Sequence, residues 1–448
     1  MRIMRGTVFP AAVFAVVLSL SWARPGYAND ICLPSHLYML SNANTDIFFQ
    51  PFAKRWRPYD DFVRIALSKG GGTFQRHLGH VATVRNPVDG AKLTARLVEG
   101  GGFTTVKSVS SVLRVGERGS GKAPVVAQIV GDSYTHGKFY KGALFDSGDV
   151  PNLRLVGMLK DGSGHFNEGR SGWTLGYYFT IPRDELFSYH GFMQPDGGRY
   201  WGATAFWKMA WKVCRRTGKV WDQPYYSCGR YDDRVTRFDE GTGRLLDPHE
   251  GDVQFEDGHF IRFDGKEWRR IDETALKWSF DYGKYLEMWG IEKPQFLFVL
   301  LGLNDFRDRI DADFSQWGSR IKTMKESYLK SCPGGRFVIC IPCSTCGSID
   351  NAAGDFTPYQ NAAMWRFRDW LIKSFDNRED EGYYLLDVGI GIDNDHGYPL
   401  EGGSVAVPAD GADGTEKLRV QGHTPHPRLD YPVMGRPLAA FIQYWRDR

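Results

Sequence analysis

Ser133 is the first residue of the chain whose setting suits covalent chemistry. It ends the segment Gly131-Asp132-Ser133, which follows an apolar run at 125–130 and precedes a helical pattern. A serine at such a turn lies at the carboxyl edge of a parallel sheet, where open α/β sheets bind their ligands. The helix behind it supplies unpaired backbone N–H groups. Ser133 therefore fits a nucleophile, although the position also suits a helix N-cap.

The surroundings of this serine exclude one common arrangement. Thr135 stands where a G-x-S-x-G elbow would carry its last glycine. The pattern therefore disfavours an α/β-hydrolase nucleophile elbow.

Two further segments place polar or glycine residues at strand ends. Gly172 lies in a glycine-containing turn at 167–174, and a glycine lets a backbone N–H approach a ligand closely. Asn304 follows the apolar run at 296–301 and brings a side-chain N–H₂ to the same edge. Each segment taken alone is also compatible with an ordinary turn.

A histidine completes the set. His426-Pro427 comes shortly before a C-terminal helical pattern, and a histidine on such a loop can act as a general base. A single histidine is more often structural than catalytic. Four such segments in chain order, however, indicate one site at the carboxyl edge of a sheet.

The elements that would position these residues form an α/β pattern. Continuous apolar runs, typical of strands buried on both faces, occur at 125–130, 153–159, 296–301, 337–341 and 383–388. Helical patterns lie between or after them at 315–331, 359–375 and 433–445. Strands that alternate with helices predict a doubly wound parallel sheet of five strands.

Two regions fall outside this alternation. Residues 29–120 contain short β-rich segments separated by glycine turns, at 37–40, 45–49, 81–84, 93–98 and 111–115, which predict a small β-sandwich domain. Residues 121–448 then form the α/β domain, with an insertion at about 182–294. Asp257-Gly258 and Asp264-Gly265 predict a β-meander inside the insertion.

The insertion is rich in aromatic residues. Trp201 and Trp207 are candidates for stacking on sugar rings, and a satellite core of the insertion is the simpler interpretation of the same cluster. Cys214 and Cys228 flank a loop and form the best candidate disulfide.

Together these segments resemble the SGNH (GDSL-type) hydrolase superfamily. The resemblance covers about residues 123–448 less the insertion and rests on Gly131-Asp132-Ser133, Gly172 in N-x-G-x-x-G-x-T, Gly302-Leu303-Asn304-Asp305 and His426-Pro427. It implies a flavodoxin-like sheet and a serine nucleophile, Ser133, with His426 as its base. It also implies an oxyanion hole formed by the N–H groups of Ser133 and Gly172 and the Asn304 side chain. The leading sandwich resembles exported bacterial carbohydrate esterases of this superfamily.

The chain departs from the family pattern at one position. The family carries an aspartate three residues before the catalytic histidine, and this chain has His423 there. Three interpretations stay open: a backbone carbonyl orients His426 in a Ser–His dyad, Asp430 or another acid substitutes, or the site is weakened. Loss of the orienting acid can lower kcat about 10⁴-fold, so the departure matters. We favour a working dyad because the other three segments are intact.

The N-terminus has the features of a secretory leader. Arg2 and Arg5 precede an apolar stretch at 8–22, and Gly26-Tyr27-Ala28 predicts cleavage after Ala28. The chain has a formal net charge of +3, and residues 1–28 carry three arginines and no acid. The mature chain is therefore neutral, which argues against a nucleic-acid partner. We expect a periplasmic or secreted protein with no stable membrane insertion after cleavage.

Seven cysteines leave at least one thiol unpaired. Cys340, Cys343 and Cys346 form C-x2-C-x2-C, which is similar to part of an iron–sulfur run. Cys340 lies inside an apolar strand pattern, so core packing is the preferred interpretation. We expect neither a metal nor an organic cofactor.

The resemblance thus implies a serine esterase that removes small acyl groups, with acetyl preferred. The predicted export and the leading sandwich point to a carbohydrate as the substrate. A lipase, a thioesterase or a polysaccharide O-acyltransferase could use the same residues. A non-catalytic carbohydrate-binding protein with a degenerate site is the alternative from another class, and His423 is the residue that favours it.

Overall fold

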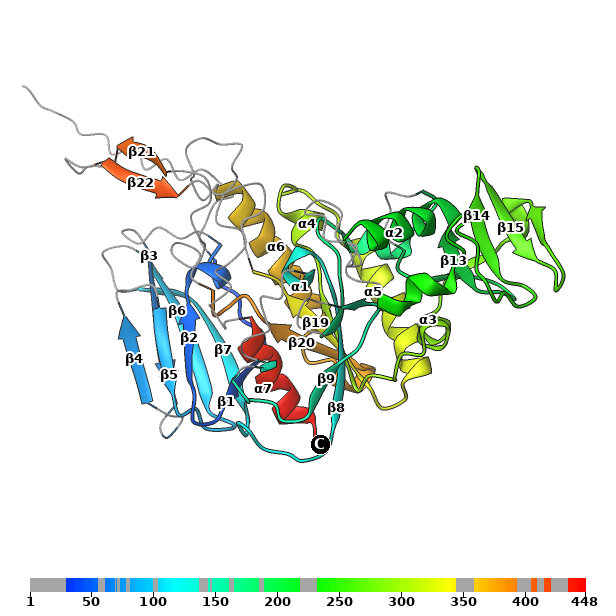
Figure 1. The fold of residues 1–448 in the computed structure, drawn as a ribbon. Coiled ribbons are helices and arrows are strands. Elements are labelled where there is room, and N and C mark those ends of the chain that lie inside the picture. Colours follow the sequence, from blue (N-terminus) through cyan, green and yellow to red (C-terminus); the bar gives the residue numbers. More distant parts are fainter. Residues whose placement is uncertain are drawn as a thin grey trace, which may run out of the picture.

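The computed structural model describes residues 30–54, 61–68, 70, 73–77, 81–99, 104–136, 144–145, 147–160, 165–184, 189–217, 232–343, 358–392, 404–408, 415–419 and 434–448. These residues form a mixed α/β structure with a mostly parallel central sheet (Figure 1). The N-terminal sheets lie at one end of the molecule and the four-stranded sheet of the insertion lies at the other.

The central sheet is built around β8 (Val125–Gly131), whose residues are all buried. Its order is β10-β11-β8-β18-β19-β20, and β9 pairs with the first half of β8. All pairings are parallel except that of β10 with β11. The other strands are β9 (Leu153–Leu155), β10 (Leu159–Lys160), β11 (Phe166–Gly169), β18 (Phe296–Leu300), β19 (Arg336–Ile341) and β20 (Tyr383–Asp387).

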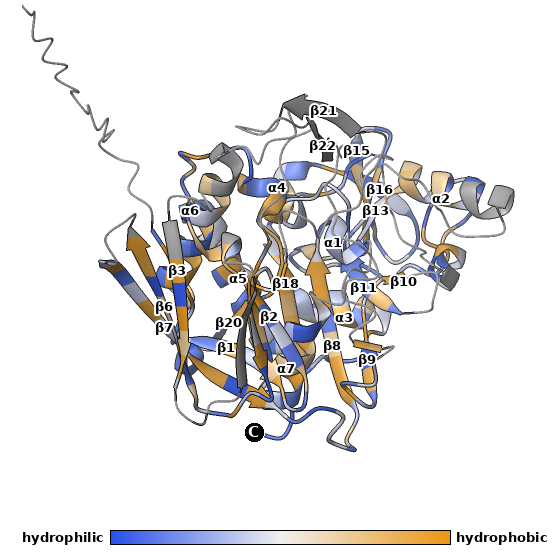
Figure 2. Cartoon of the chain, turned by 90° about the vertical axis from the view of Figure 1, so that its left-hand side faces the viewer, coloured by the Kyte–Doolittle hydropathy of each residue, from blue (hydrophilic) through white to orange (hydrophobic). Residues whose placement is uncertain are grey.

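The apolar runs of the sequence account for most of these strands. Figure 2 shows β8 and β18 as largely hydrophobic, as expected for strands covered on both faces. The run expected as one strand at 153–159 is instead divided into β9 and β10. A Cβ on Gly157 would lie 2.4 Å from the Asn167 carbonyl oxygen, so the chain passes tightly against β11 at the break.

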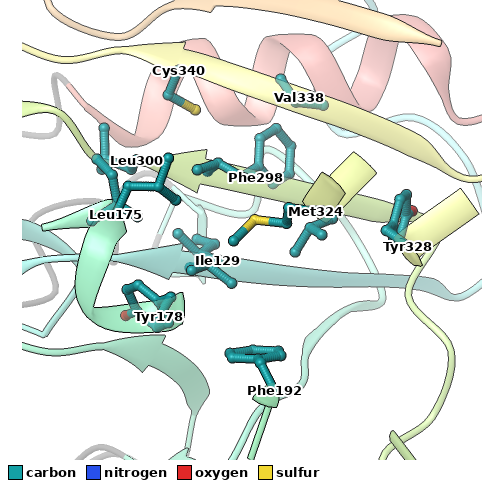
Figure 3. Packing of buried hydrophobic residues seen from close by; sticks show 14 of the residues in the cluster. Ile129, Leu175, Tyr178, Phe192, Phe298, Leu300, Met324, Tyr328, Val338 and Cys340 are labelled. Carbon is teal, nitrogen blue, oxygen red and sulfur yellow. The ribbon is translucent and has the colours of Figure 1, made fainter. Parts of the chain in front are cut away.

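Helices cover both faces of the sheet. On one face, Phe441 of α7 (Gly435–Trp445) contacts Phe298 of β18, with ring centroids 5.8 Å apart. On the other, Tyr328 of α5 (Ser315–Ser331) contacts Phe337 of β19 at 6.2 Å. Phe337 is in register with Leu297, the neighbour of Phe298, so the two helices meet opposite faces. Figure 3 shows Met324 and Tyr328 of α5 beside these strands, in the same hydrophobic core as Ile129, Phe298 and Val338.

The remaining helices are α1 (Ser133–His136), α2 (Thr204–Thr217), α3 (Tyr282–Trp289), α4 (Leu303–Phe306) and α6 (Pro358–Phe375). Short 3₁₀ helices are η1 (Gln50–Phe52), η3 (Leu175–Phe179), η4 (Asp232–Arg237), η5 (Glu273–Ala275) and η6 (Glu379–Glu381). The prediction of a helix at 315–331 is confirmed to the residue, and the two other predicted helices agree within two residues. No helix among these described residues is both long and apolar enough to cross a membrane.

Two small sheets precede the central one. One has the order β1-β7-β6-β3 and the other β2-β5-β4, and their inward side chains share a hydrophobic core. The strands are β1 (His36–Leu40), β2 (Asn44–Phe48), β3 (Asp61–Leu67), β4 (Thr73–His77), β5 (Val81–Arg85), β6 (Lys92–Glu99) and β7 (Thr105–Gly116). All five β-segments predicted at 31–120 are present, whereas β3 and β4 were not predicted.

The N-terminal sheets are fixed to the α/β part by hydrogen bonds. The Trp365 indole donates to the Phe52 carbonyl at 3.0 Å, and the Phe48 N–H donates to the Ile390 carbonyl at 2.9 Å. Beside them, the Arg368 guanidinium is paired with the Asp387 carboxylate at the end of β20, and both side chains are buried. The interface between the N-terminal sheets and the α/β part therefore includes a buried ion pair beside these hydrogen bonds.

The insertion forms sheets of its own. The meander predicted from its two Asp-Gly turns is confirmed as β14 (Val253–Glu256), β15 (His259–Phe263) and β16 (Trp268–Ile271), joined by β13 (Tyr200–Ala203). Strand β12 (Met193–Pro195) pairs with β17 (Trp278–Phe280). Outside the insertion, β21 (Ser404–Pro408) pairs with β22 (Thr415–Arg419). Helix α3 starts at its N-cap Asp281 and packs against α5, so it belongs to the helix layer of the central sheet.

Removal of the Arg368 side chain should destabilise the protein strongly. Arg368→Ala leaves the Asp387 carboxylate buried without its partner, and such losses cost about 3–5 kcal/mol. Urea denaturation, read as the free energy of unfolding, measures this. Arg154→Ala is the control, because its pair with Glu292 is about half exposed and should cost under about 1 kcal/mol. Equal losses in the two variants would contradict a stabilising role for this buried ion pair.

Candidate active site

Three strands of the central sheet end side by side. Gly131 at the end of β8 is in parallel register with Gly169 at the end of β11 and with Leu300 at the end of β18. The segments that carry Ser133, Gly172 and Asn304 therefore leave the sheet from one edge. The structure confirms this part of the predicted arrangement.

Ser133 is the first residue of α1 and is buried, with 4% of its surface exposed. Asp132 precedes the helix, and its Oδ1 accepts a hydrogen bond from the Tyr134 N–H at 3.0 Å. Asp132 thus provides the N-cap interaction, which leaves Ser133 without that role. No hydrogen bond within the described residues involves the Ser133 hydroxyl.

Gly131 is required for this turn to close. A Cβ at this position would lie 2.0 Å from Thr135 Oγ1 and 2.9 Å from the Leu300 carbonyl oxygen. Any larger residue would push α1 away from β18 and would displace Ser133 with it.

The turn that carries Gly172 is fixed to β8. The Arg170 N–H donates to the Gly131 carbonyl at 3.0 Å, and the Trp173 N–H donates to the Arg170 carbonyl at 3.1 Å. Gly172 itself has φ +75°, and a Cβ there would meet no atom within 4 Å. The glycine is therefore needed for its left-handed backbone and borders open space.

A buried ion pair lies beneath this turn. Arg170 Nη1 is 2.7 Å from Glu168 Oε2, and the two side chains are 1% and 0% exposed. Arg170 Nη2 donates to the Tyr189 carbonyl at 3.0 Å, and Glu168 also accepts from the Met158 N–H and the Tyr285 hydroxyl. These bonds fix the strand end and the turn as one unit.

Asn304 joins the first two segments. Its Nδ2 donates to the Trp173 carbonyl at 3.1 Å and lies 3.4 Å from Asp132 Oδ2. Gly302 precedes it with φ +116°, and a Cβ there would be 2.2 Å from the Phe367 ring. Glycine is therefore the residue that lets β18 turn beneath α6 and present Asn304.

Two carboxyl groups of the site, those of Asp132 and Asp305, have raised pKa values. Burial raises the pKa of Asp132 to about 7, and a smaller contribution comes from the nearby Asp305 carboxylate. Burial also raises the pKa of Asp305 to about 6, although the Leu175 N–H donates to it at 3.1 Å. The site therefore carries less negative charge near neutral pH than its two acids suggest.

The arrangement brings hydrogen-bond donors together beside Ser133. Neither the Ser133 N–H nor the Gly172 N–H takes part in a hydrogen bond within the described residues. Asn304 adds amide hydrogens from the third strand. The two unused backbone donors at this edge can stabilise the negative oxygen that forms when a serine attacks a carbonyl. The Asn304 amide lies beside them, with its hydrogens directed at the Trp173 carbonyl and at Asp132 Oδ2.

His190 is a buried histidine close to these segments. Its Nε2 donates to the Thr180 carbonyl at 2.9 Å, and its Nδ1 accepts from the Phe192 N–H at 3.2 Å. Burial lowers its pKa to about 3. Both ring nitrogens are occupied and the ring is neutral, so His190 does not fit a general base.

Several predicted residues lie outside the described part of the chain. They are His423, His426, Asp430, Cys228 and Cys346, and their places in the predicted site, disulfide and cysteine run stay predictions. Cys214 lies in α2. Cys340 and Cys343 are buried, and burial raises the pKa of Cys340. Among the described residues no cluster of histidine, cysteine or acidic side chains could hold a metal ion.

Trp201 and Trp207 are core residues, as the simpler interpretation of the cluster predicted, and the alternative that they stack on sugar rings is wrong. Both are 0% exposed. Trp207 stacks on Phe238 with ring centroids 3.8 Å apart and donates from Nε1 to the Trp201 carbonyl at 2.5 Å. No ring face is left for a ligand, because burial of the aromatic area stabilises the insertion instead.

The sequence analysis missed the Glu168–Arg170 pair and the partly exposed Trp173. All three residues lie in the turn at 167–174 that was identified through its glycines. Two opposite charges inside a glycine turn at a strand end are the signal that could have shown a buried ion pair.

The comparisons with known proteins assign no family. No family model matches the sequence, and no curated protein matches it. Structural matches include the Ig1-2 module of Drosophila receptor protein tyrosine phosphatase DLAR, with 14% identity over 23% of this chain and 61% of that chain, at a TM-score of 0.16. A putative alpha-galactosidase/melibiase of Bacteroides fragilis is 10% identical over 77% of this chain and 55% of that chain, at a TM-score of 0.18. The chain thus spans less than two thirds of the length of each of these two structures. TM-scores this low support no inference about fold or function.

The Asp132 carboxyl should make stability depend on pH. Between its ordinary pKa of 3.8 and its folded pKa of about 7, the native state holds a proton that the unfolded chain has lost. The contribution of Asp132 to the free energy of unfolding therefore falls as pH rises through this window, by about 4 kcal/mol in all. Urea denaturation from pH 4 to pH 8 gives the free energy of unfolding of the wild type and of Asp132→Asn. The wild-type value minus the Asp132→Asn value should decrease steadily as the pH rises.

Asp313→Asn is the matched control for this experiment. Asp313 is exposed, and hydrogen bonds from Ser315 lower its pKa, so its contribution changes only below pH 4. If the difference between the wild type and Asp132→Asn stays flat across pH 4 to pH 8, the Asp132 carboxyl is ionised in the fold and this account of the site is wrong.

The two left-handed glycines of the site should respond differently to alanine. Gly172→Ala has room and should lose about 1–2 kcal/mol from backbone strain alone. Gly302→Ala adds a collision with the Phe367 ring and should lose about 1–3 kcal/mol more. Thermal unfolding of the two variants gives the comparison, and a smaller loss for Gly302→Ala would contradict the described turn.

Proposed function

We propose that this protein is an exported serine esterase of the SGNH type that removes small acyl groups from a carbohydrate. The observation that carries the proposal is the meeting of Ser133, the unused Gly172 N–H and the Asn304 amide at one edge of the sheet. These are three of the four segments on which the family resemblance rests.

The strand order supports the same assignment. If β9 and β11 are taken together as the second strand, the parallel strands follow the order 2-1-3-4-5 along the sheet. This is the flavodoxin-like order, in which ligands bind at the switch point beside the first strand. Ser133 follows β8, the first strand, so it occupies that position.

The proposed reaction has two steps. Ser133 Oγ attacks the ester carbonyl carbon while His426 takes the hydroxyl proton, and the carbonyl oxygen becomes an oxyanion. The N–H groups of Ser133 and Gly172 and the Asn304 amide donate hydrogen bonds to that oxyanion. The intermediate collapses to an acyl-enzyme, and the sugar alkoxide leaves with the proton of His426. Water then attacks the acyl group by the same route and restores Ser133.

The described residues contribute to this chemistry by pre-organisation. Asn304 is oriented by its bond to the Trp173 carbonyl, and the Gly172 turn is fixed to β8 through Arg170. Donors already in place need no reorganisation when charge develops on the substrate. The neutral form of Asp132 favours the same step, since a carboxylate beside an oxyanion would repel it.

The carbohydrate substrate rests on the predicted leader and on the β-sheets that precede the α/β part. Acyl transfer to a second sugar would use the same acyl-enzyme with a hydroxyl in place of water. Product analysis with an acceptor sugar separates transfer from hydrolysis. A non-catalytic carbohydrate-binding protein is the second candidate, because His423 replaces the usual aspartate.

Hydrolysis of p-nitrophenyl acetate tests the assignment. The wild type should release nitrophenol and Ser133→Ala should not, because the nucleophile is absent. Asn304→Ala should lower kcat about 10²–10³-fold, as expected for one lost oxyanion donor. Ser319→Ala is the control, since its exposed hydroxyl only contacts its own helix at the Ser315 carbonyl.

Two results would overturn the proposal. One is equal activity in the wild type and in folded Ser133→Ala. The other is no activity in either protein on activated esters, which would favour the carbohydrate-binding alternative.

A further inference from the structure

Trp173 lies directly beside the proposed oxyanion site. It follows Gly172 in the chain, and its carbonyl accepts the Asn304 amide at 3.1 Å. The start of its side chain is therefore fixed within one residue of a proposed catalytic donor. A ligand whose carbonyl oxygen accepts from the Gly172 N–H therefore lies next to Trp173 in the chain.

The Trp173 ring is held from its inner side. Its centroid is 5.0 Å from the buried Tyr178 ring, in an edge contact, and 5.7 Å from the buried His190 ring. The Arg170 guanidinium lies over the indole at 5.1 Å. These contacts restrict the rotation of the ring, so little conformational entropy remains to be lost when a ligand binds.

The outer side of the indole remains partly exposed. Tyr177, on η3, is 37% exposed, and its ring lies 5.6 Å from that of Trp173 at an interplanar angle of 42°. No hydrogen bond within the described residues involves Trp173 Nε1. The two rings therefore form a partly open aromatic surface with a polar donor.

The Arg320 side chain lies beside η3, the 3₁₀ helix that carries Tyr177. Arg320 Nη1 would be 3.0 Å from a Cβ placed on Gly176, the residue before Tyr177. Arg320 makes no ion pair within the described residues. Its guanidinium lies over the Phe179 ring at 5.9 Å, and its N–H groups can donate hydrogen bonds to a ligand beside η3.

We propose that Trp173 and Tyr177 form a sugar-binding platform that stacks on a pyranose ring of the substrate, with Arg320 donating to its hydroxyls. A pyranose has an apolar C–H face with hydroxyls around its rim, which matches aromatic faces edged by polar donors. An acyl chain would need an enclosed apolar pocket, which these exposed rings do not provide. This inference rests on the proposed function for the placement of the acyl group at Ser133.

Kinetics on two esters provide the first test. Tyr177→Ala should lower kcat/KM on acetylated xylotetraose five- to tenfold more than kcat/KM on p-nitrophenyl acetate, which has no sugar. Trp173→Phe should show a smaller difference of the same sign. Trp268→Ala, a partly exposed tryptophan of the insertion, is the control and should show no difference between the esters. Equal losses of Tyr177→Ala on both esters would overturn the platform and leave the esterase standing.

Binding provides a second test that does not depend on hydrolysis. Cellotetraose, xylotetraose and chitotetraose are titrated into the Ser133→Ala protein by calorimetry and tryptophan fluorescence. At least one should bind, and Tyr177→Ala in the same background should weaken it five- to tenfold. No binding of any of the three at 10 mM, or binding that Tyr177→Ala leaves unchanged, would overturn the platform. Binding with no hydrolysis by the wild type would overturn the esterase alone.

Discussion

The site depends on one buried ion pair, that of Glu168 with Arg170. Removing two charges from water is costly, and good geometry with additional hydrogen bonds is needed to offset that cost. Here Glu168 accepts from Arg170, the Met158 N–H and the Tyr285 hydroxyl, while Arg170 also donates to the Tyr189 carbonyl. These hydrogen bonds restrict the positions of the β11 end and of the turn after it. They extend into the insertion through the Tyr189 carbonyl. The turn that carries Gly172 is therefore held in a fixed position relative to β8.

Hydrogen bonds extend from this ion pair across the edge of the sheet. The backbone of Arg170 bonds to Gly131, and the carbonyl of Trp173 orients Asn304, so three strand ends behave as a unit. Asp132 caps the first turn of α1 in place of Ser133 and leaves the serine unbonded. Burial of Asp132 and Asp305 raises their pKa values and reduces negative charge where an oxyanion would form. A single set of contacts thus serves both the fold and the proposed chemistry.

The parts that sequence analysis predicted well are those governed by periodicity. Strands β8, β18, β19 and β20 are continuous apolar runs, and the two Asp-Gly turns located the meander. Strand β11, with the sequence FNEG, is not a continuous apolar run, because its charged Glu168 is buried by an ion pair with Arg170, two residues further along the chain. Trp201 and Trp207 pack in a core, which was the simpler interpretation, but composition alone does not separate a buried indole from an exposed one. The further partners of this ion pair, such as the Tyr285 hydroxyl, are distant in the sequence and cannot be deduced from a local pattern.

The central claim is that Ser133 is a nucleophile beside ready oxyanion donors. Its most direct test is reaction of the folded protein with a fluorophosphonate, followed by intact-mass measurement and peptide mapping. The account predicts one adduct per chain, located on Ser133, with much slower labelling in Asn304→Ala. An unmodified chain, or a modification on another residue, would contradict it.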